Sequence, residues 1–115
     1  MSLTLGESQA MIQKTARDFF AAECPPSVVR AMERDERGYP PHLWRQMAEM
    51  GWLGVTLPGE YGGQEASFTT LLVLLQEMGR AVVPSPFFST VVLAGQLILR
   101  AGSEEQKAAL LPKLF

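Results

Sequence analysis

Apolar residues recur every three or four positions in six stretches of the chain, which is the spacing of the buried face of an amphipathic helix. The first predicted helix covers about residues 5–23 and stops before two prolines. The second lies in SVVRAMERDERG, residues 27–38, where Gly38 is expected to end it. The third lies in YPPHLWRQMAEMG, residues 39–51, with prolines at its start and Gly51 as its C-cap.

The second half of the chain continues this pattern. A fourth helix begins near Ser67 and carries the run LLVLL, which is apolar nearly all round and predicts a central position. The sequence VVPSP breaks it, and a fifth helix covers about residues 86–101 before Gly102. The sixth helix follows, and its expected buried stripe is Leu110, Leu111 and Leu114.

Two of these helices begin with the spacing of a capping box, in which two residues three apart satisfy each other's backbone N–H groups. Thr4 and Glu7 have this spacing at the first helix, and Ser103 and Gln106 have it at the sixth. The only plausible extended piece is WLGVTLP, residues 52–58. The pattern therefore predicts an all-α fold, a single six-helix, bundle-like domain spanning residues 1–115.

Composition narrows the class of protein. The chain is 47% hydrophobic and 19% charged, which is typical of a folded globule rather than a disordered segment. Its 10 basic residues are scattered among 12 acidic ones, so the charge pattern argues against a nucleic-acid partner. No apolar run approaches the ~20 residues of a membrane span, and the N-terminus lacks a signal-peptide pattern. With its single cysteine, the chain is expected to be soluble and cytoplasmic.

The residues alone show no complete catalytic or metal-binding set. His42 is the only histidine, so it lacks the partners of a triad or a histidine metal site and is expected at the surface or as a capping residue. Cys24 is the only cysteine, and its place before two prolines favours a structural role over a reactive one. The acidic pairs at 35–36 and 104–105 are expected at solvated helix ends.

Residues 51–68, GWLGVTLPGEYGGQEASF, hold five glycines and one proline. Their spacing matches neither a dinucleotide-binding motif nor a P-loop, and no βαβ pattern surrounds them. The residues by themselves favour a tight turn that uses the access of glycine to positive φ.

Four segments taken in order give a more specific signal. They are GWLGVTLPGEYGG, LLVLLQEMGRA, VPSPF and AGSEEQKAALLPKL. In order and spacing they resemble the N-terminal helical domain of the acyl-CoA dehydrogenases, over essentially the whole chain. The resemblance implies that the chain is the first third of such an enzyme, without its middle β-domain and its C-terminal helical domain.

The resemblance also implies a function. It indicates a flavoprotein oxidoreductase of lipid metabolism, as in fatty acid oxidation, that uses FAD to oxidise acyl-CoA thioesters to trans-2-enoyl-CoA. In this family a carboxylate removes the α-proton while the β-hydride moves to N5 of FAD. The electrons would go to an electron-transfer flavoprotein or an equivalent acceptor, and the enzyme would be a homo- or hetero-oligomer. Because the family's catalytic Glu and most FAD contacts belong to the other two domains, the resemblance implies no catalytic, cofactor-binding or metal residue here, and no activity or FAD binding for the chain alone.

Carried over position by position, the wall of the family's acyl-chain cavity falls near the start of the fifth helix. The implied substrate-binding residues are Ser85, Phe88, Ser89, Val92, Leu93 and Gln96. An acyl chain favours close-fitting apolar walls, since each buried CH₂ contributes about 0.8 kcal/mol. Ordinary packing between helices remains the alternative role for these side chains.

Two other functions stay open. VPSPF is similar to bacterial members of the family, some of which combine two kinds of subunit and place the catalytic base on only one of them. The parent chain would then be a non-catalytic subunit. The missing catalytic set also fits a stand-alone helical interaction module. The acyl-chain specificity is not predicted.

Overall fold

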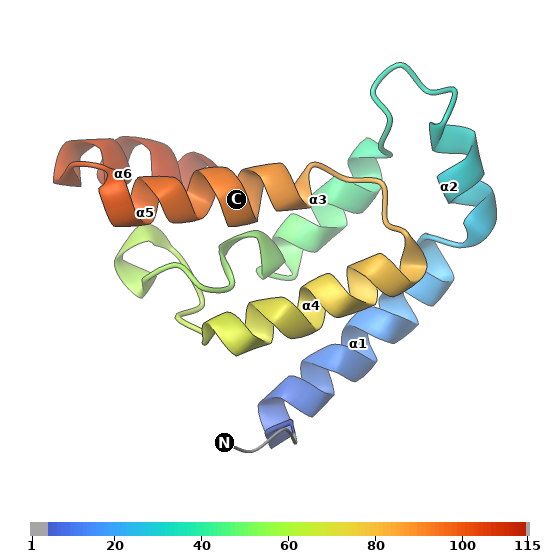
Figure 1. The fold of residues 1–115 in the computed structure, drawn as a ribbon, viewed down its shortest axis with the longest axis horizontal. Helices are drawn as coiled ribbons and strands as arrows, with labels where there is room; N and C mark the ends of the chain where they lie inside the picture. Colours follow the sequence, from blue (N-terminus) through green and yellow to red (C-terminus); the bar gives the residue numbers. More distant parts are fainter. Residues whose placement is uncertain (1–4, 115) are drawn as a thin grey trace. The chain divides into compact units, whose positions relative to one another are not determined.

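The computed structural model describes residues 5–114, and within them it contains helices and turns but no β-strand (Figure 1). This confirms the predicted all-α fold. The six α-helices are α1 (Glu7–Glu23), α2 (Pro26–Met32), α3 (Pro41–Glu49), α4 (Phe68–Ala81), α5 (Gln96–Ala101) and α6 (Glu104–Leu110). A π-helix, η3 (Phe88–Gly95), precedes α5, and three short 3₁₀ turns are η1 (Trp52–Gly54), η2 (Gly59–Tyr61) and η4 (Leu111–Leu114).

The chain forms two compact units. The first contains residues 5–38 and 67–84, with α1, α2 and α4. The second contains residues 39–66 and 85–114, with α3, η3, α5, α6 and the 3₁₀ turns. The chain therefore passes from one unit to the other three times.

The first unit is built on α1 and α4, which pack along each other. Ala16 and Phe20 of α1 are buried, as are Leu71 and Leu74 of α4. The expectation that LLVLL is central is met on one face only, because Leu72 remains 49% exposed. The helix is amphipathic despite its apolar sequence.

The N-terminal end of α1 differs from the prediction. Gly6 is its N-cap, and the Gly6 N–H donates to Oε1 of Gln9 at 3.1 Å. The predicted capping box pairs Glu7 with Thr4, which lies outside the described residues.

The end of α2 also differs, because this helix stops at Met32 rather than near Gly38. The carboxylate of Asp35 accepts hydrogen bonds from the N–H groups of Arg37 at 2.8 Å and Gly38 at 3.2 Å. An aspartate that binds nearby backbone groups offers the chain an alternative to the helix, so it turns early.

In the second unit, Leu43 and Met47 of α3 are fully buried, and the chain leaves α3 through Gly51 at φ +79°. The predicted C-cap is off by one position, because Met50 is the C-cap and Gly51 follows it in the left-handed conformation that ends the helix. The segment WLGVTLP is not extended. It forms η1 and a further turn, with the Val55 N–H bonded to the Trp52 carbonyl at 3.4 Å, so local turns satisfy its backbone.

The capping box of α6 is confirmed. The Ser103 N–H donates to Oε1 of Gln106 at 2.9 Å, and the Gln106 N–H donates to Oγ of Ser103 at 3.2 Å. The stripe predicted for this helix is only partly right, because Leu111 is buried while Leu110 is 45% exposed. The chain changes there from α to 3₁₀ geometry in η4, which changes the angle between successive side chains.

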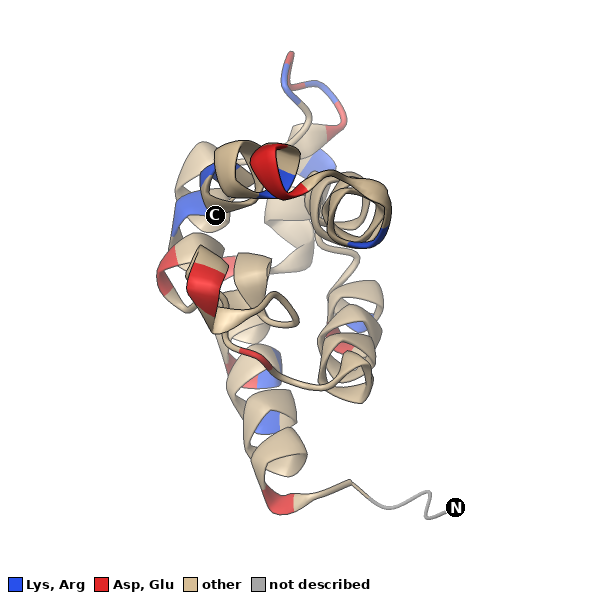
Figure 2. Ribbon diagram, turned by 90° about the vertical axis from the view of Figure 1, so that its left-hand side faces the viewer, with Lys and Arg blue, Asp and Glu red and all other residues tan. Residues whose placement is uncertain are grey.

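Acidic and basic residues are interspersed over the fold, as Figure 2 shows. None of the helices in the described part of the chain has the length and hydropathy that crossing a membrane requires.

Candidate functional site

The predicted site residues lie on η3 and its two ends. The sequence predicts one continuous helix over 86–101, and the structure resolves it into the π-helix η3 followed by α5. Apolar periodicity does not distinguish a π-helix from an α-helix over so few residues. π-Helical geometry is rare and occurs frequently at functional sites.

The π-helix has a buried face and an exposed face. Phe87 and Val91 are 2% and 4% exposed, so they belong to the core. Phe88 and Leu93 are each 56% exposed. They are five residues apart, which places them on one side of a helix with i→i+5 bonding. Val92, half-buried, lies next to Leu93. The exposure of Phe88 and Leu93 argues against simple packing between helices of this chain as their role.

The two predicted serines form hydrogen bonds at the start of η3. Oγ of Ser85 accepts the Phe87 N–H at 3.4 Å, and Oγ of Ser89 donates to the Pro86 carbonyl at 3.1 Å. Both hydroxyls therefore fix local backbone next to the exposed apolar side chains.

Gln96 has a different role from the other predicted residues. Its Nε2 donates to Oγ1 of Thr56 at 2.9 Å, and its Oε1 accepts from Nε of Arg100 at 3.4 Å. The side chain thus ties the junction of η3 and α5 to the glycine-rich loop. The structure brings Phe88, Val92 and Leu93 together on η3 and assigns Gln96 to holding this helix in place.

The glycine-rich loop is a self-contained turn, as predicted. Its N–H groups are used within the loop: Gly62 donates to the Gly59 carbonyl at 2.9 Å, Gly63 to that of Pro58 at 3.1 Å, and Glu65 to that of Leu57 at 3.0 Å. A phosphate cradle needs several free N–H groups that point at the anion. These N–H groups are therefore not free to form such a cradle.

One charged pair was missed by the sequence analysis. Glu77 on α4 has a side chain only 1% exposed, and Arg17 on α1 binds it with two hydrogen bonds, Nε to Oε1 at 2.7 Å and Nη2 to Oε2 at 3.2 Å. These bonds lower the pKa of the Glu77 carboxyl, against the opposing effect of burial. The signal was present, since Glu77 follows Leu74 by three positions and so lies on the buried face of α4.

The remaining candidate residues are His42, Cys24 and the two acidic pairs. His42 is exposed, as expected. Cys24 is 3% exposed, and burial raises the pKa of its thiol, which agrees with a structural role. In the predicted acidic pairs, Glu36, Glu104 and Glu105 are exposed and Asp35 is half-buried. Among residues 5–114, no three potential metal ligands of the His, Cys, Asp and Glu types lie close enough to hold an ion.

The site is thus an exposed apolar face on a small helical unit rather than a catalytic constellation. Comparison with known proteins identifies the family of this chain. Residues 6–115 match the family model of the acyl-CoA dehydrogenase N-terminal domain, and the chain belongs to this family.

Two curated relatives illustrate the match. The acyl-CoA dehydrogenase IpdE2 of Mycobacterium tuberculosis is 33% identical over 90% of this chain and 33% of its own length. The acryloyl-CoA reductase (NADH) of Anaerotignum propionicum is 31% identical over 99% of this chain and 29% of its own length.

A solved structure also matches this chain. A variant of the Tcur3481-Tcur3483 steroid ACAD is 40% identical, with a TM-score of 0.86 over 96% of this chain and 30% of that one. The chain therefore spans about a third of the length of the relatives that it matches.

Proposed function

We propose that this chain is the N-terminal domain of an FAD-dependent acyl-CoA dehydrogenase that oxidises an acyl-CoA thioester to the trans-2-enoyl-CoA. The observation that carries the proposal is the family match over residues 6–115. The exposed apolar face of η3 supports it, because an acyl chain needs such a surface and the described fold does not cover it.

Within that enzyme, η3 forms part of the wall of the acyl-chain pocket. Phe88, Val92 and Leu93 supply apolar contact area, while Ser85 and Ser89 fix the first turn of the helix. Gln96 holds the helix against the glycine-rich loop through Thr56. A wall built on a helix keeps its shape better than one built on a mobile loop.

The catalytic base and the FAD site belong, in this proposal, to the rest of the protein. Among the described residues, Glu77 is the buried carboxylate. Its pKa is lowered and Arg17 binds it through two hydrogen bonds, so it is a poor base for a substrate proton near neutral pH. In the glycine-rich loop, the N–H groups of Gly62, Gly63 and Glu65 are already bonded to backbone carbonyls. The chain alone is therefore expected to be inactive.

The visible spectrum of the protein at its natural length tests the proposal. A yellow protein whose flavin absorbance bleaches when acyl-CoA is added supports it. A colourless protein, or a flavin indifferent to every acyl-CoA supplied, would contradict it and would favour a stand-alone interaction module.

A second candidate has a specific observation behind it. The structure that is 40% identical to this chain carries a name that joins two proteins, Tcur3481 and Tcur3483. This favours a parent chain that acts as one subunit of a two-subunit enzyme, and it adds steroid acyl-CoA thioesters to the substrates worth testing. Purification of the parent chain with and without the product of a neighbouring gene distinguishes the two cases. Full FAD occupancy and activity in the parent chain alone would exclude the second candidate.

A further inference from the structure

A cavity of about 520 Å³ lies in the first unit, where the C-terminal half of α1, α2 and the end of α4 meet. This volume is within the range of small-molecule sites. Most of its lining is apolar and includes Phe20, Cys24, Val29 and Val82. All of the predicted acyl-wall residues belong to the second unit, so the cavity and that wall share no lining residue.

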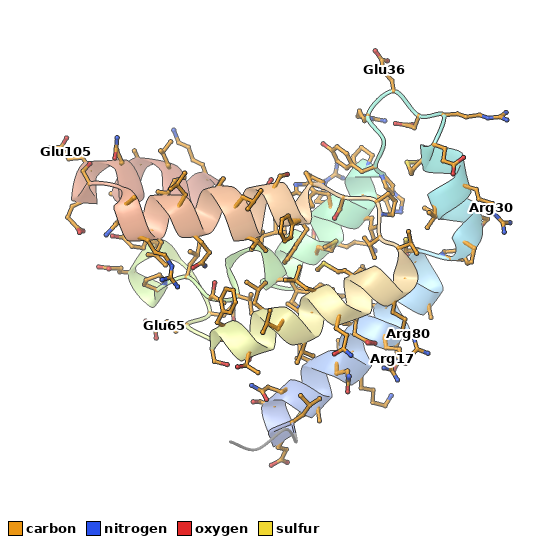
Figure 3. The ribbon with its side chains drawn as sticks, in the orientation of Figure 1. Arg17, Arg30, Glu36, Glu65, Arg80 and Glu105 are labelled. Atoms are coloured by element: carbon orange, nitrogen blue, oxygen red, sulfur yellow. The ribbon has the colours of Figure 1, made fainter. Side chains whose placement is uncertain are left out.

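The polar side chains of the cavity are mostly cationic. Arg17, Arg30 and Arg80 line it together with Glu77, which leaves a net charge of +2 from three guanidinium groups and one carboxylate. Figure 3 labels the three arginines on α1, α2 and α4.

The carboxylate is already committed, because Arg17 binds it through two nitrogens. Arg80 contributes to lowering the pKa of Glu77 through its charge alone. Within the part of the chain that the structure describes, neither Arg30 nor Arg80 makes a salt bridge or a side-chain hydrogen bond. Two arginines that line the cavity therefore have no hydrogen-bonded anionic partner among the described residues.

Val82, on the wall formed by α4, has an unusual conformation. Its φ of +54° lies in the left-handed region, which β-branched residues rarely adopt, and its side chain is 64% exposed. The Val82 N–H bonds to the Gly79 carbonyl at 3.2 Å, and the Val83 N–H bonds to the Met78 carbonyl at 3.0 Å. This is the Schellman pattern, in which glycine is usual at the left-handed position. Here the chain keeps an apolar side chain next to the cavity in spite of the conformational cost.

We propose that this cavity binds a small amphipathic carboxylate, with its apolar body against Phe20, Val29 and Val82 and its head group at Arg30 and Arg80. A guanidinium group presents a planar fork of donors that matches the two oxygens of a carboxylate. The apolar lining excludes a purely polar anion, and the uncompensated arginines disfavour a neutral or cationic amphiphile.

Isothermal titration of the protein at its natural length tests this proposal, with decanoate as the probe and decanol and decyltrimethylammonium as comparisons. We expect decanoate to bind saturably and at least about fivefold more tightly than decanol. Arg30→Gln and Arg80→Gln should each weaken decanoate binding by about fivefold and leave decanol binding unchanged. Arg45→Gln, which removes an exposed arginine of the second unit, is the matched control and should change neither.

Two further variants locate the ligand. Ala21→Leu enlarges a side chain on the α1 wall while keeping a good helix former, so it should weaken decanoate and decanol alike. Phe88→Ala removes a proposed acyl-wall residue and should leave decanoate binding unchanged. If Phe88→Ala abolishes binding while the arginine variants do not, decanoate occupies the acyl pocket and the proposal is wrong. Equal affinity for decanoate and decanol, or no binding of decanoate, would overturn it as well.

Discussion

Glu77 shows how one residue can decide the arrangement of two helices. A carboxylate that is almost completely removed from water is tolerated only with a well-placed partner. Arg17 supplies two charge-assisted hydrogen bonds while its own side chain remains 46% exposed. The pair therefore fixes the register of α1 against α4, in addition to the apolar contacts between them.

The pH dependence of stability follows from the direction of the Glu77 pKa. Because this pKa is lower in the folded than in the unfolded protein, the pair contributes stability above the unfolded value, which is near 4.5. This contribution is lost as the pH falls through the lower, folded-state pKa. We expect urea denaturation to show a free energy of unfolding that declines on acidification below about pH 4.5, and a shallower decline in Glu77→Gln.

For Arg17→Met we expect the pH dependence of stability to have the opposite sign. Without its partner the buried Glu77 carboxyl prefers to be protonated, so its pKa rises above the unfolded value and acidification should stabilise the variant relative to the unaltered protein. Lys14→Met is the control, because it removes a cation from the exposed pair with Asp18 on the same helix. Identical pH profiles for the unaltered protein and Glu77→Gln would show that the pair contributes nothing.

Val82 offers a second test at the scale of one residue. Replacing it with glycine removes the steric cost of the left-handed conformation and loses little buried apolar surface, since the side chain is 64% exposed. We expect Val82→Gly to raise the free energy of unfolding by about 1 kcal/mol in urea denaturation. Val82→Ala keeps a Cβ in the same conformation and should stay close to the unaltered protein. A destabilised Val82→Gly would mean that the contacts of the valine outweigh the strain.

At the scale of the element, the glycine-rich loop depends on close approach rather than on ligand binding. A Cβ on Gly63 would lie 2.1 Å from the backbone carbonyl oxygen of Leu57, so a side chain there would force the loop apart. We expect Gly63→Ala to lower the free energy of unfolding by about 2–3 kcal/mol. Gly79→Ala is the matched control, because nothing lies within 4 Å of a Cβ at that position of α4. It should be neutral or stabilising by up to about 1 kcal/mol, as alanine favours a helix. A tolerated Gly63→Ala would show that the loop can rearrange without cost.

The sequence was most informative where one residue type has one physical role. Ser103 with Gln106, and Gly51 after the third helix, mark helix ends correctly because capping is local. Local patterns failed where tertiary contacts or competing hydrogen bonds determine the structure. Asp35 ends α2 earlier than predicted. The exposed apolar face of η3 with Phe88 and Leu93 depends on π-helical hydrogen bonding, which apolar periodicity does not encode.

Burial in the candidate site was harder to predict than helix positions. An apolar helix such as residues 86–101 shows which residues are hydrophobic but not which side meets the core. The structure separates buried Phe87 from exposed Phe88, two adjacent residues of the same type. The family resemblance selected the exposed one, and its contact with an acyl chain stays a prediction.

At the scale of the whole molecule, the chain leaves a long apolar strip uncovered. Leu97 on α5 is 66% exposed and lies four residues after Leu93, so it continues the face of η3. Leu110 on α6 lines a small cavity with Leu97. Contiguous exposed apolar surface of this kind marks an interaction site. Since the relatives are about three times as long as this chain, we propose that the rest of the protein and its substrate share this strip.

Substitutions on η3 in the protein at its natural length separate the two uses of the strip. Phe88→Ala and Leu93→Ala remove proposed contacts with the acyl chain, and each should raise KM for the preferred acyl-CoA by about 15-fold, from the loss of about two buried carbon groups. The effect should shrink with shorter acyl chains, since these do not reach the missing side chain. Met11→Ala removes a side chain that is 67% exposed on α1, in the other unit, and should leave KM unchanged. If Phe88→Ala and Leu93→Ala instead lower thermal stability with KM constant for all chain lengths, η3 packs against protein rather than substrate.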